Sequence, residues 1–438
     1  MLSNTKSWQP IKNVTLNKNM EYVVKQVARK LQFPHEVLGE PLPGTDSLAS
    51  GALGIVLFYA ELDRLYPDEQ WDVVAHNYLV HIQAVINTDM FDSFSLWSGL
   101  SAAPVVASIL ARDRGRYQNF IEKLHILIQP AIDEFIDQAR GRIGNNLFMS
   151  DYDVIEGLAG IGRYLLFFKE HPACKENLNK ALSYIIQLTK NIQFNDKSVP
   201  GWHIRSENQF LEFEKKRYPN GNFNLGISHG IAGPFALLSL ALLEGVEVEG
   251  QRDAIRQLSS YYEKWKAEDE HGPIWPERIS FEEETCGQMK NAFAHNASWC
   301  YGEPSIARAL WLAGEALGDT RIQSMAQETY LSLVQRSVES FSFESPTFCH
   351  GYAGTLWMLQ RMMMDTGPDA SFEAYREKLV NQILSVFNDN HAYGFQDIEH
   401  GQFRDLPGLL VGAAGVALVL LSCMSLDEPE WDCIFLLK

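Results

Sequence analysis

The sequence of 438 residues predicts an all-α protein in which seven helical hairpins close into one ring. Three observations support this fold class. Clusters of small residues recur seven times, each cluster opens an apolar helical run, and an amphipathic stretch separates one cluster from the next. The first glycines of the clusters stand at positions 51, 99, 157, 230, 302, 351 and 412, so neighbouring clusters lie 48 to 73 residues apart. Each interval is long enough for two helices.

The stretches between clusters are predicted to form the outer helices. In residues 21–33, 117–139, 178–192 and 372–388, apolar residues recur three or four apart with charged residues between them. The runs that begin at the glycines, such as 230–243 and 412–424, are apolar on nearly all sides, as a helix between an outer layer and a core requires. Inner helices of a closed ring run the same way, so their N-termini converge on one mouth that favours anions. We attribute Gly51, Gly99 and Gly412 to close packing alone.

Two segments do not fit the helical pattern. Residues 193–225 and 267–290 carry proline, glycine and aromatic residues with the alternation typical of short strands and turns. We therefore predict one domain spanning residues 1–438, with small insertions in these two segments that lie over the mouth.

Composition excludes several classes of protein. No segment approaches ~18 consecutive apolar residues, so we expect no transmembrane segment. The polar start lacks a secretory pattern and predicts a cytoplasmic protein. The net charge of -18 argues against a nucleic-acid partner. The six cysteines do not resemble a disulfide framework, and a reducing compartment keeps them available to a metal. They are Cys174, Cys286, Cys300, Cys349, Cys423 and Cys433.

The fifth and sixth clusters carry candidate metal ligands. Cys300 precedes the fifth glycine in "WCYG", and Cys349 and His350 stand side by side in "CHGYAG". If the ring closes, these side chains come from adjacent helix starts and can converge. Two thiolates and one imidazole are typical zinc ligands, and a fourth position left open is typical of a catalytic site. Three separately buried side chains remain the alternative.

The third and fourth clusters add titratable groups. His229 stands at the corresponding helix start, and Asp151 and Asp153 lie just upstream of the third cluster. A histidine near a zinc site but outside its ligand set is a candidate general acid or base, with a carboxylate to orient it. The alternative for Asp153 is a helix N-cap.

Together, "SHGIAGP", "WCYG" and "CHGYAG" resemble the lanthipeptide cyclases of the LanC family, which includes LanC-like proteins of animals. The resemblance covers about residues 47–422. It implies an α/α toroid, a double ring of seven inner and seven outer helices, with a small inserted α+β domain over the mouth. It also implies one zinc ion held by Cys300, Cys349 and His350. The family's proton-transfer histidine falls on His229, its aspartate on Asp153 and its active-site tyrosine on Tyr301.

One position departs from the family. Bacterial relatives that make lantibiotics commonly carry an arginine four residues before the first zinc cysteine, and Asn296 stands there in this sequence. Asparagine donates hydrogen bonds but brings no positive charge. Asn296 and the neighbouring His295 are therefore candidate contacts for the substrate or for an enolate, although His295 can equally be an ordinary packing residue.

The activity implied by the resemblance is zinc-dependent addition of a peptide cysteine thiol to dehydroalanine or dehydrobutyrine, which closes a thioether ring. The implied partners are a dehydrated precursor peptide, a dehydratase and a peptide exporter, whose complex would bring the protein to the membrane. Two other classes stay open. One is a LanC-like protein that only binds thiols such as glutathione. The other is a zinc protein prenyltransferase subunit, which the Cys-Cys-His ligand set disfavours.

Overall fold

The computed structural model describes residues 7–88, 93–112, 115–290, 293–341 and 343–438. The first six residues of the polar N-terminal stretch lie outside the described residues, so the expectation about a secretory signal stays a prediction. None of the described helices combines the length and the apolar character needed to cross a lipid bilayer.

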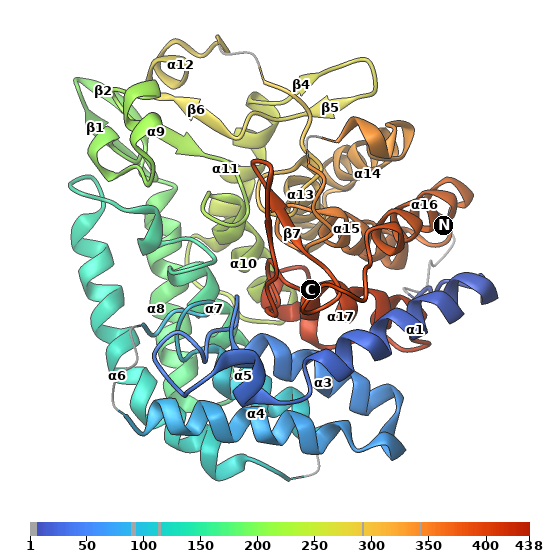
Figure 1. Ribbon diagram of the computed structural model, residues 1–438. Coiled ribbons are helices and arrows are strands. Elements are labelled where there is room, and N and C mark those ends of the chain that lie inside the picture. Colours follow the sequence, from blue (N-terminus) through green and yellow to red (C-terminus); the bar gives the residue numbers. More distant parts are fainter. Residues whose placement is uncertain (1–6, 89–92, 113–114, 291–292, 342) are drawn as a thin grey trace.

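Two layers of helices form a closed ring, which confirms the predicted fold class (Figure 1). The outer helices are α1 (Val14–Lys30), α4 (Trp71–Ile86), α6 (Gln118–Arg142), α8 (Pro172–Leu188), α11 (Gln251–Lys264), α14 (Thr320–Gln335) and α16 (Ala370–Ser385). The inner helices are α3 (Ala52–Leu65), α5 (Ala102–Ala111), α7 (Leu158–Phe167), α10 (Ala232–Leu243), α13 (Glu303–Leu317), α15 (Tyr352–Thr366) and α17 (Ala413–Met424). Each inner helix packs against the next, and α17 packs against α3.

Burial follows the two hydrophobic patterns of the sequence. In the inner helix α10, every residue from Ala232 to Leu242 is buried. In the outer helix α11, the buried residues Ile255, Leu258 and Tyr262 recur three or four apart and face the inner layer. Burying one such leucine stabilises the fold by about 1.5–3 kcal/mol. The ring is therefore held by its apolar interface between layers.

Each inner helix is preceded by a tight loop that excludes side chains at its first glycine. A Cβ atom at Gly351 would lie 2.2 Å from the carbonyl oxygen of Ser345. Likewise, a Cβ atom at Gly99 would lie 2.2 Å from the carbonyl oxygen of Ser93. In both loops the carbonyl belongs to the residue six positions before the glycine. The structure thus supports close packing as the reason for the glycines.

Backbone hydrogen bonds join these seven loops into a closed circle, which we call the loop circle. In six links, the residue two positions before the first glycine donates its N–H to a carbonyl at the same position of the next loop. They run from Cys300 to Cys349, Cys349 to Leu410, Leu410 to Ala49, Ala49 to Trp97, Trp97 to Ile155 and Ser228 to Cys300. The seventh link is offset by one residue and runs from Val154 to Ser228. The N···O distances are 2.9 to 3.4 Å.

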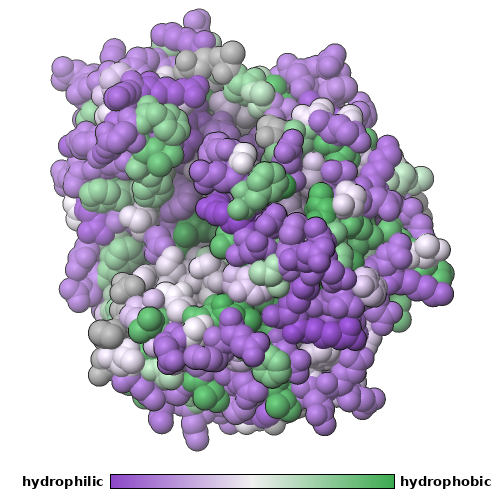
Figure 2. All heavy atoms as spheres, in the orientation of Figure 1, coloured by the Kyte–Doolittle hydropathy of each residue, from purple (hydrophilic) through white to green (hydrophobic). Residues whose placement is uncertain are grey.

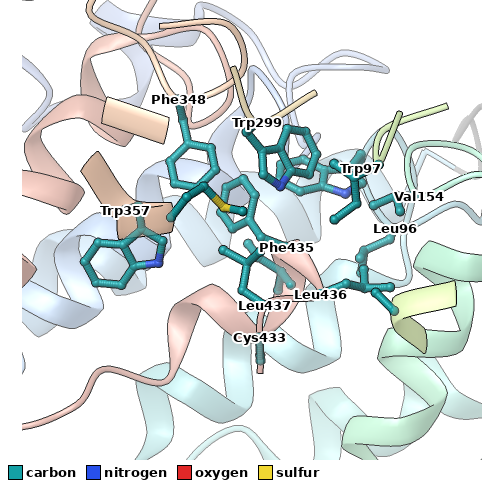
Figure 3. Packing of buried hydrophobic residues seen from close by; sticks show 14 of the residues in the cluster. Leu96, Trp97, Val154, Trp299, Phe348, Trp357, Cys433, Phe435, Leu436 and Leu437 are labelled. Atoms are coloured by element: carbon teal, nitrogen blue, oxygen red, sulfur yellow. The ribbon is translucent and has the colours of Figure 1, made fainter. Parts of the chain in front are cut away.

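The C-terminal segment fills the centre of the ring below this circle. In the 3₁₀ helix Trp431–Phe435, the Phe435 ring lies 3.8 Å from that of Phe348, 4.8 Å from Trp97 and 5.3 Å from Trp299, measured between centroids (Figure 3). Aromatic pairs of this kind contribute about 0.5–1.5 kcal/mol each beyond burial. The loops that carry the candidate site therefore pack on a layer of buried aromatic rings around Phe435, which we call the aromatic floor.

Arginines of three inner helices bind the same C-terminal segment. Arg163 of α7 donates to the carbonyl of Cys433 at 3.0 Å, and Arg308 of α13 donates to that of Leu437 at 2.7 Å. Arg361 of α15 pairs with the buried carboxylate of Asp432. These bonds tie the floor to the surrounding helices.

Within the described residues, four antiparallel strand pairs accompany the helical ring. They are β1 (Asn191–Phe194) with β2 (Lys197–Pro200), β3 (Asn222–Asn224) with β6 (Arg278–Ser280), β4 (Ala267–Glu268) with β5 (Pro273–Ile274), and β7 (Asp397–Glu399) with β8 (Gln402–Arg404). The short helices are α2 (Pro34–Leu38), α9 (Glu212–Arg217) and α12 (Phe281–Cys286). The first three strand pairs fall in or beside the two segments predicted as insertions, and β3–β6 joins them. The β7–β8 hairpin was not predicted.

Candidate functional site

Five of the predicted site residues stand one or two residues before the first glycine of a loop. Cys300 and Cys349 stand two residues before a first glycine and are themselves links of the circle. His229, Tyr301 and His350 stand one residue before a first glycine, in three consecutive loops. The backbone bonds of the circle therefore bring together, at one level of the mouth, residues far apart in sequence.

The two thiols interact directly. A hydrogen bond from Cys349 lowers the pKa of Cys300 to about 7, and it outweighs the opposing effect of burial; Ser298 and the charge of His350 act in the same direction. The same hydrogen bond and burial raise the pKa of Cys349 well above its usual range. One thiol of the pair thus ionises readily, which is the state that binds a metal.

His350 is oriented by a carboxylate that the sequence analysis missed. Its Nε2 lies 2.9 Å from Oδ1 of Asp397, a fully buried residue at the start of β7. Ser345 Oγ donates to the same oxygen at 3.0 Å, and Arg404 donates to Oδ2 at 2.7 Å. Burial alone would lower the pKa of His350, but the hydrogen bond and charge of Asp397, together with the charges of Cys300 and Glu399, raise that pKa. Since Nε2 is engaged, Nδ1 is the ring nitrogen left for a metal.

The donor set Cys300, Cys349 and His350 fits zinc in its chemistry, with two soft thiols and an imidazole held by a carboxylate. Its spacing is not that of a formed metal site. Across the part of the chain that the structure describes, no group of three or more histidine, cysteine, aspartate and glutamate side chains is gathered to hold a metal ion. The assignment of the ligands stays a prediction.

His229 and Asp153 form a pair across two neighbouring loops. Nδ1 of His229 lies 2.6 Å from Oδ2 of Asp153, which is fully buried. The other oxygen of Asp153 accepts the N–H groups of Glu156 and Gly157, both at 2.7 Å. Burial would lower the pKa of His229, yet the hydrogen bond and charge of Asp153 raise it. Asp153 therefore serves both the loop before α7 and the histidine, but it is not a helix N-cap, because the residue at that position is Gly157.

Tyr301 lies beside the strands β3 and β6. Its hydroxyl oxygen is 3.3 Å from Nδ2 of Asn224 and 3.4 Å from Nη2 of Arg278. The Arg278 guanidinium also lies over the tyrosine ring, 5.0 Å from its centroid. Burial raises the pKa of Tyr301 to about 12, so the hydroxyl keeps its proton at neutral pH.

The side chains of Asn296 and His295 contact different carboxylates. Asn296 donates through Nδ2 to Glu277 at 3.1 Å and borders the cavity that contains the candidate ligands. His295 Nδ1 lies 2.8 Å from Glu303 Oε2, and its ring faces Phe341. Neither residue takes part in the pairs formed by the other site residues, so their roles stay predictions.

Two cavities meet at the site. One, of about 480 Å³, contains Cys300 and His350. The other, of about 390 Å³, is lined by residues of α9 and by Arg278 of β6. Asn296 lines both. Figure 2 shows hydrophobic residues over α9. Phe210, two residues before α9, meets the ring of His229 edge to face at 5.1 Å between centroids. The space beside the candidate ligands is large enough for part of a peptide.

Fold and site together define a class of protein: a closed ring of helical hairpins with thiols, imidazoles and a buried carboxylate at the starts of its inner helices. A family model described as "Lanthionine synthetase C-like protein" matches residues 43–436, so the chain belongs to the lanthionine synthetase C-like family.

Two relatives agree with this membership. The chain is 29% identical over 358 residues to the nisin biosynthesis protein NisC of Lactococcus lactis subsp. lactis, covering 80% of this chain and 82% of the relative. A solved structure described as nisin cyclase superposes with a TM-score of 0.79 at 25% identity, covering 97% of this chain and 98% of the other.

Proposed function

We propose that this protein closes thioether rings in a ribosomally made peptide, by adding cysteine thiols to dehydroalanine or dehydrobutyrine with the help of one zinc ion. The observation that carries the proposal is the His229–Asp153 pair, since the loop of His229 is bonded to that of Cys300, which is bonded in turn to the loop of Cys349 and His350. Membership of the lanthionine synthetase C-like family supports it.

The residues divide into two groups by role. Cys300, Cys349 and His350 would hold the zinc ion, which when bound supplies the positive charge that removes the proton of an incoming thiol at neutral pH. Sulfur then attacks the β-carbon of the alkene, and the electron pair of the double bond moves to the adjacent carbonyl as an enolate. His229, whose pKa is raised by Asp153, delivers a proton to the α-carbon. The thiol proton leaves to solvent and His229 regains a proton from solvent, so no atom is gained or lost overall.

The biological setting follows from the same proposal. The substrate would be a precursor already dehydrated by a partner enzyme, and the protein would act in the cytoplasm. A complex with a dehydratase and a peptide exporter would bring it to the membrane. Membership of the family supports this setting, and so does the similarity to a relative named for nisin biosynthesis.

Ring closure is tested by mass and thiol content together. The protein with zinc is expected to convert a cognate dehydrated precursor to a product of unchanged mass whose cysteines no longer react with an alkylating reagent. The reaction is quenched with denaturant and chelator before alkylation, and a zinc-free sample measures uncatalysed closure. Thiols that become reactive again after the quench would indicate a thiol-binding protein, and an increase in mass would indicate prenyl transfer.

Asp397→Asn is expected to weaken zinc binding by about 10–100-fold, because it removes the carboxylate that orients His350. Competition with a chromophoric chelator measures the affinity. Glu399→Gln is the matched control, since Glu399 shares Arg404 with Asp397. Equal zinc affinity in Asp397→Asn and in the unmodified protein would contradict the orienting role.

A further inference from the structure

The hydroxyl of Tyr301 is approached by two groups that only donate hydrogen bonds. These are the amide nitrogen of Asn224 at 3.3 Å and a guanidinium nitrogen of Arg278 at 3.4 Å. A phenol oxygen has two lone pairs and a single hydrogen. If both neighbours donate, the lone pairs are occupied and the tyrosine's own hydrogen must point elsewhere.

Each of these two neighbours makes a second contact, and that contact identifies it as a hydrogen-bond donor to Tyr301. The N–H of Gly226 donates to Oδ1 of Asn224 at 3.0 Å, so the oxygen of this amide faces Gly226 and its NH₂ group faces Tyr301. Asn224 is fully buried. Nη2 of Arg278 also contacts Oε1 of Glu214 at 2.5 Å, which uses one of its hydrogens and leaves the other for Tyr301. A guanidinium has no acceptor to offer.

A single strand pair holds both donors. Asn224 and Arg278 are directly opposite each other in the β3–β6 ladder. Tyr301 follows Cys300 in the loop circle, at the position that carries His229 and His350 in the neighbouring loops. Among the described residues, the hydrogen bonds of the Tyr301 hydroxyl are these two, and in both it accepts.

We propose that Asn224 and Arg278 are positioning residues that fix the Tyr301 hydroxyl as a hydrogen-bond donor to the substrate oxygen on which negative charge develops during ring closure. The inference rests on the proposed function. Attack of sulfur on the alkene moves an electron pair onto this oxygen, and a donor already aimed at it stabilises the enolate without reorganisation. The strands β3 and β6 thereby contribute to the chemistry.

Asn224→Asp tests the direction of the hydrogen bond with almost no change in shape. The new carboxylate keeps an acceptor for Gly226 but offers Tyr301 an acceptor in place of a donor, so the tyrosine hydrogen turns toward residue 224. Removing one such donor costs about 10²–10³-fold in kcat. We expect a loss of that order in Asn224→Asp and in Tyr301→Phe, with little change in KM. In the Tyr301→Phe background, Asn224→Asp should add less than about twofold.

Asn222→Asp is the matched control. Asn222 is also fully buried on β3, but its amide donates to Gln209 at 2.9 Å. The effect of Asn222→Asp on kcat should be the same in the unmodified protein and in the Tyr301→Phe background. If Asn224→Asp does not fold, Arg278→Met can replace it in the same comparison with Tyr301→Phe. Arg278→Lys, which keeps a donor, should retain more activity than Arg278→Met. Zinc content and thermal midpoint are measured for each variant.

The outcomes separate this inference from the function on which it rests. An unmodified protein that fails to cyclise a cognate dehydrated precursor overturns both. If the unmodified protein is active while the losses of Asn224→Asp and Tyr301→Phe simply multiply, the positioning role is wrong and the proposed function stands. A loss in Asn224→Asp that disappears in the Tyr301→Phe background supports the inference.

Discussion

Alanine in place of Cys300, Cys349 or His350 is expected to leave the protein folded, without zinc and without ring-closing activity. Fold and metal are separable because Cys300 and Cys349 join the loop circle through backbone N–H and C=O groups, which alanine retains. The apolar interface between the helix layers is also unchanged. Without the metal, a substrate thiol with a pKa near ~8.5 remains mostly protonated at neutral pH.

Elemental analysis of the purified protein measures this effect, and circular dichroism reports the helical content. Cys286→Ala is the matched control, because it removes an exposed thiol at the end of α12. The control is expected to keep one zinc ion per chain and full activity. Unmodified protein that carries no zinc, or alanine variants that all keep it, would show that these residues are not the ligands.

His229→Ala and Asp153→Asn are expected to keep zinc and thiol binding but to close rings about 10²–10⁴-fold more slowly, the range of general acid catalysis. His229→Ala removes the proton donor. Asp153→Asn keeps an oxygen for the N–H groups of Glu156 and Gly157 while removing the charge that raises the pKa of His229. The loop before α7 should therefore keep its shape.

Single-turnover kinetics with a dehydrated precursor give the rates, and zinc content is measured on the same samples. The two losses should not multiply in the double variant, because Asp153 acts through His229. Loss of metal in either single variant would place that residue among the ligands and overturn the division of roles.

The ring could be predicted from the sequence because its signals are local. Each outer helix carries its own apolar stripe, each inner helix is apolar throughout, and each loop carries its glycine. The same regularity singled out His229, Cys300 and His350, since they stand beside glycines that open inner helices. Closure of the ring then brings these positions together, which is why their proximity could be expected.

The partners of these residues could not be predicted in this way. Asp397 lies on a hairpin without a hydrophobic pattern, and Asn224 and Arg278 lie in strands of three residues. The floor residue Phe435 belongs to a short 3₁₀ helix whose place depends on the whole ring. Their contacts join residues far apart in sequence, so local periodicity carries no information about them.

The loop circle has a consequence for how such a chain can change during evolution. Each loop is bonded to two others, so gaining or losing a hairpin would alter the circumference, and a hairpin added between the loops of Cys300 and Cys349 would move the two thiols apart. Lengthening the chain between two loops leaves the circumference unaltered. The strands β1 to β6 and the β7–β8 hairpin both occupy such intervals. New recognition surfaces can thus be acquired by insertion, while the number of repeats is held constant by the geometry of the site.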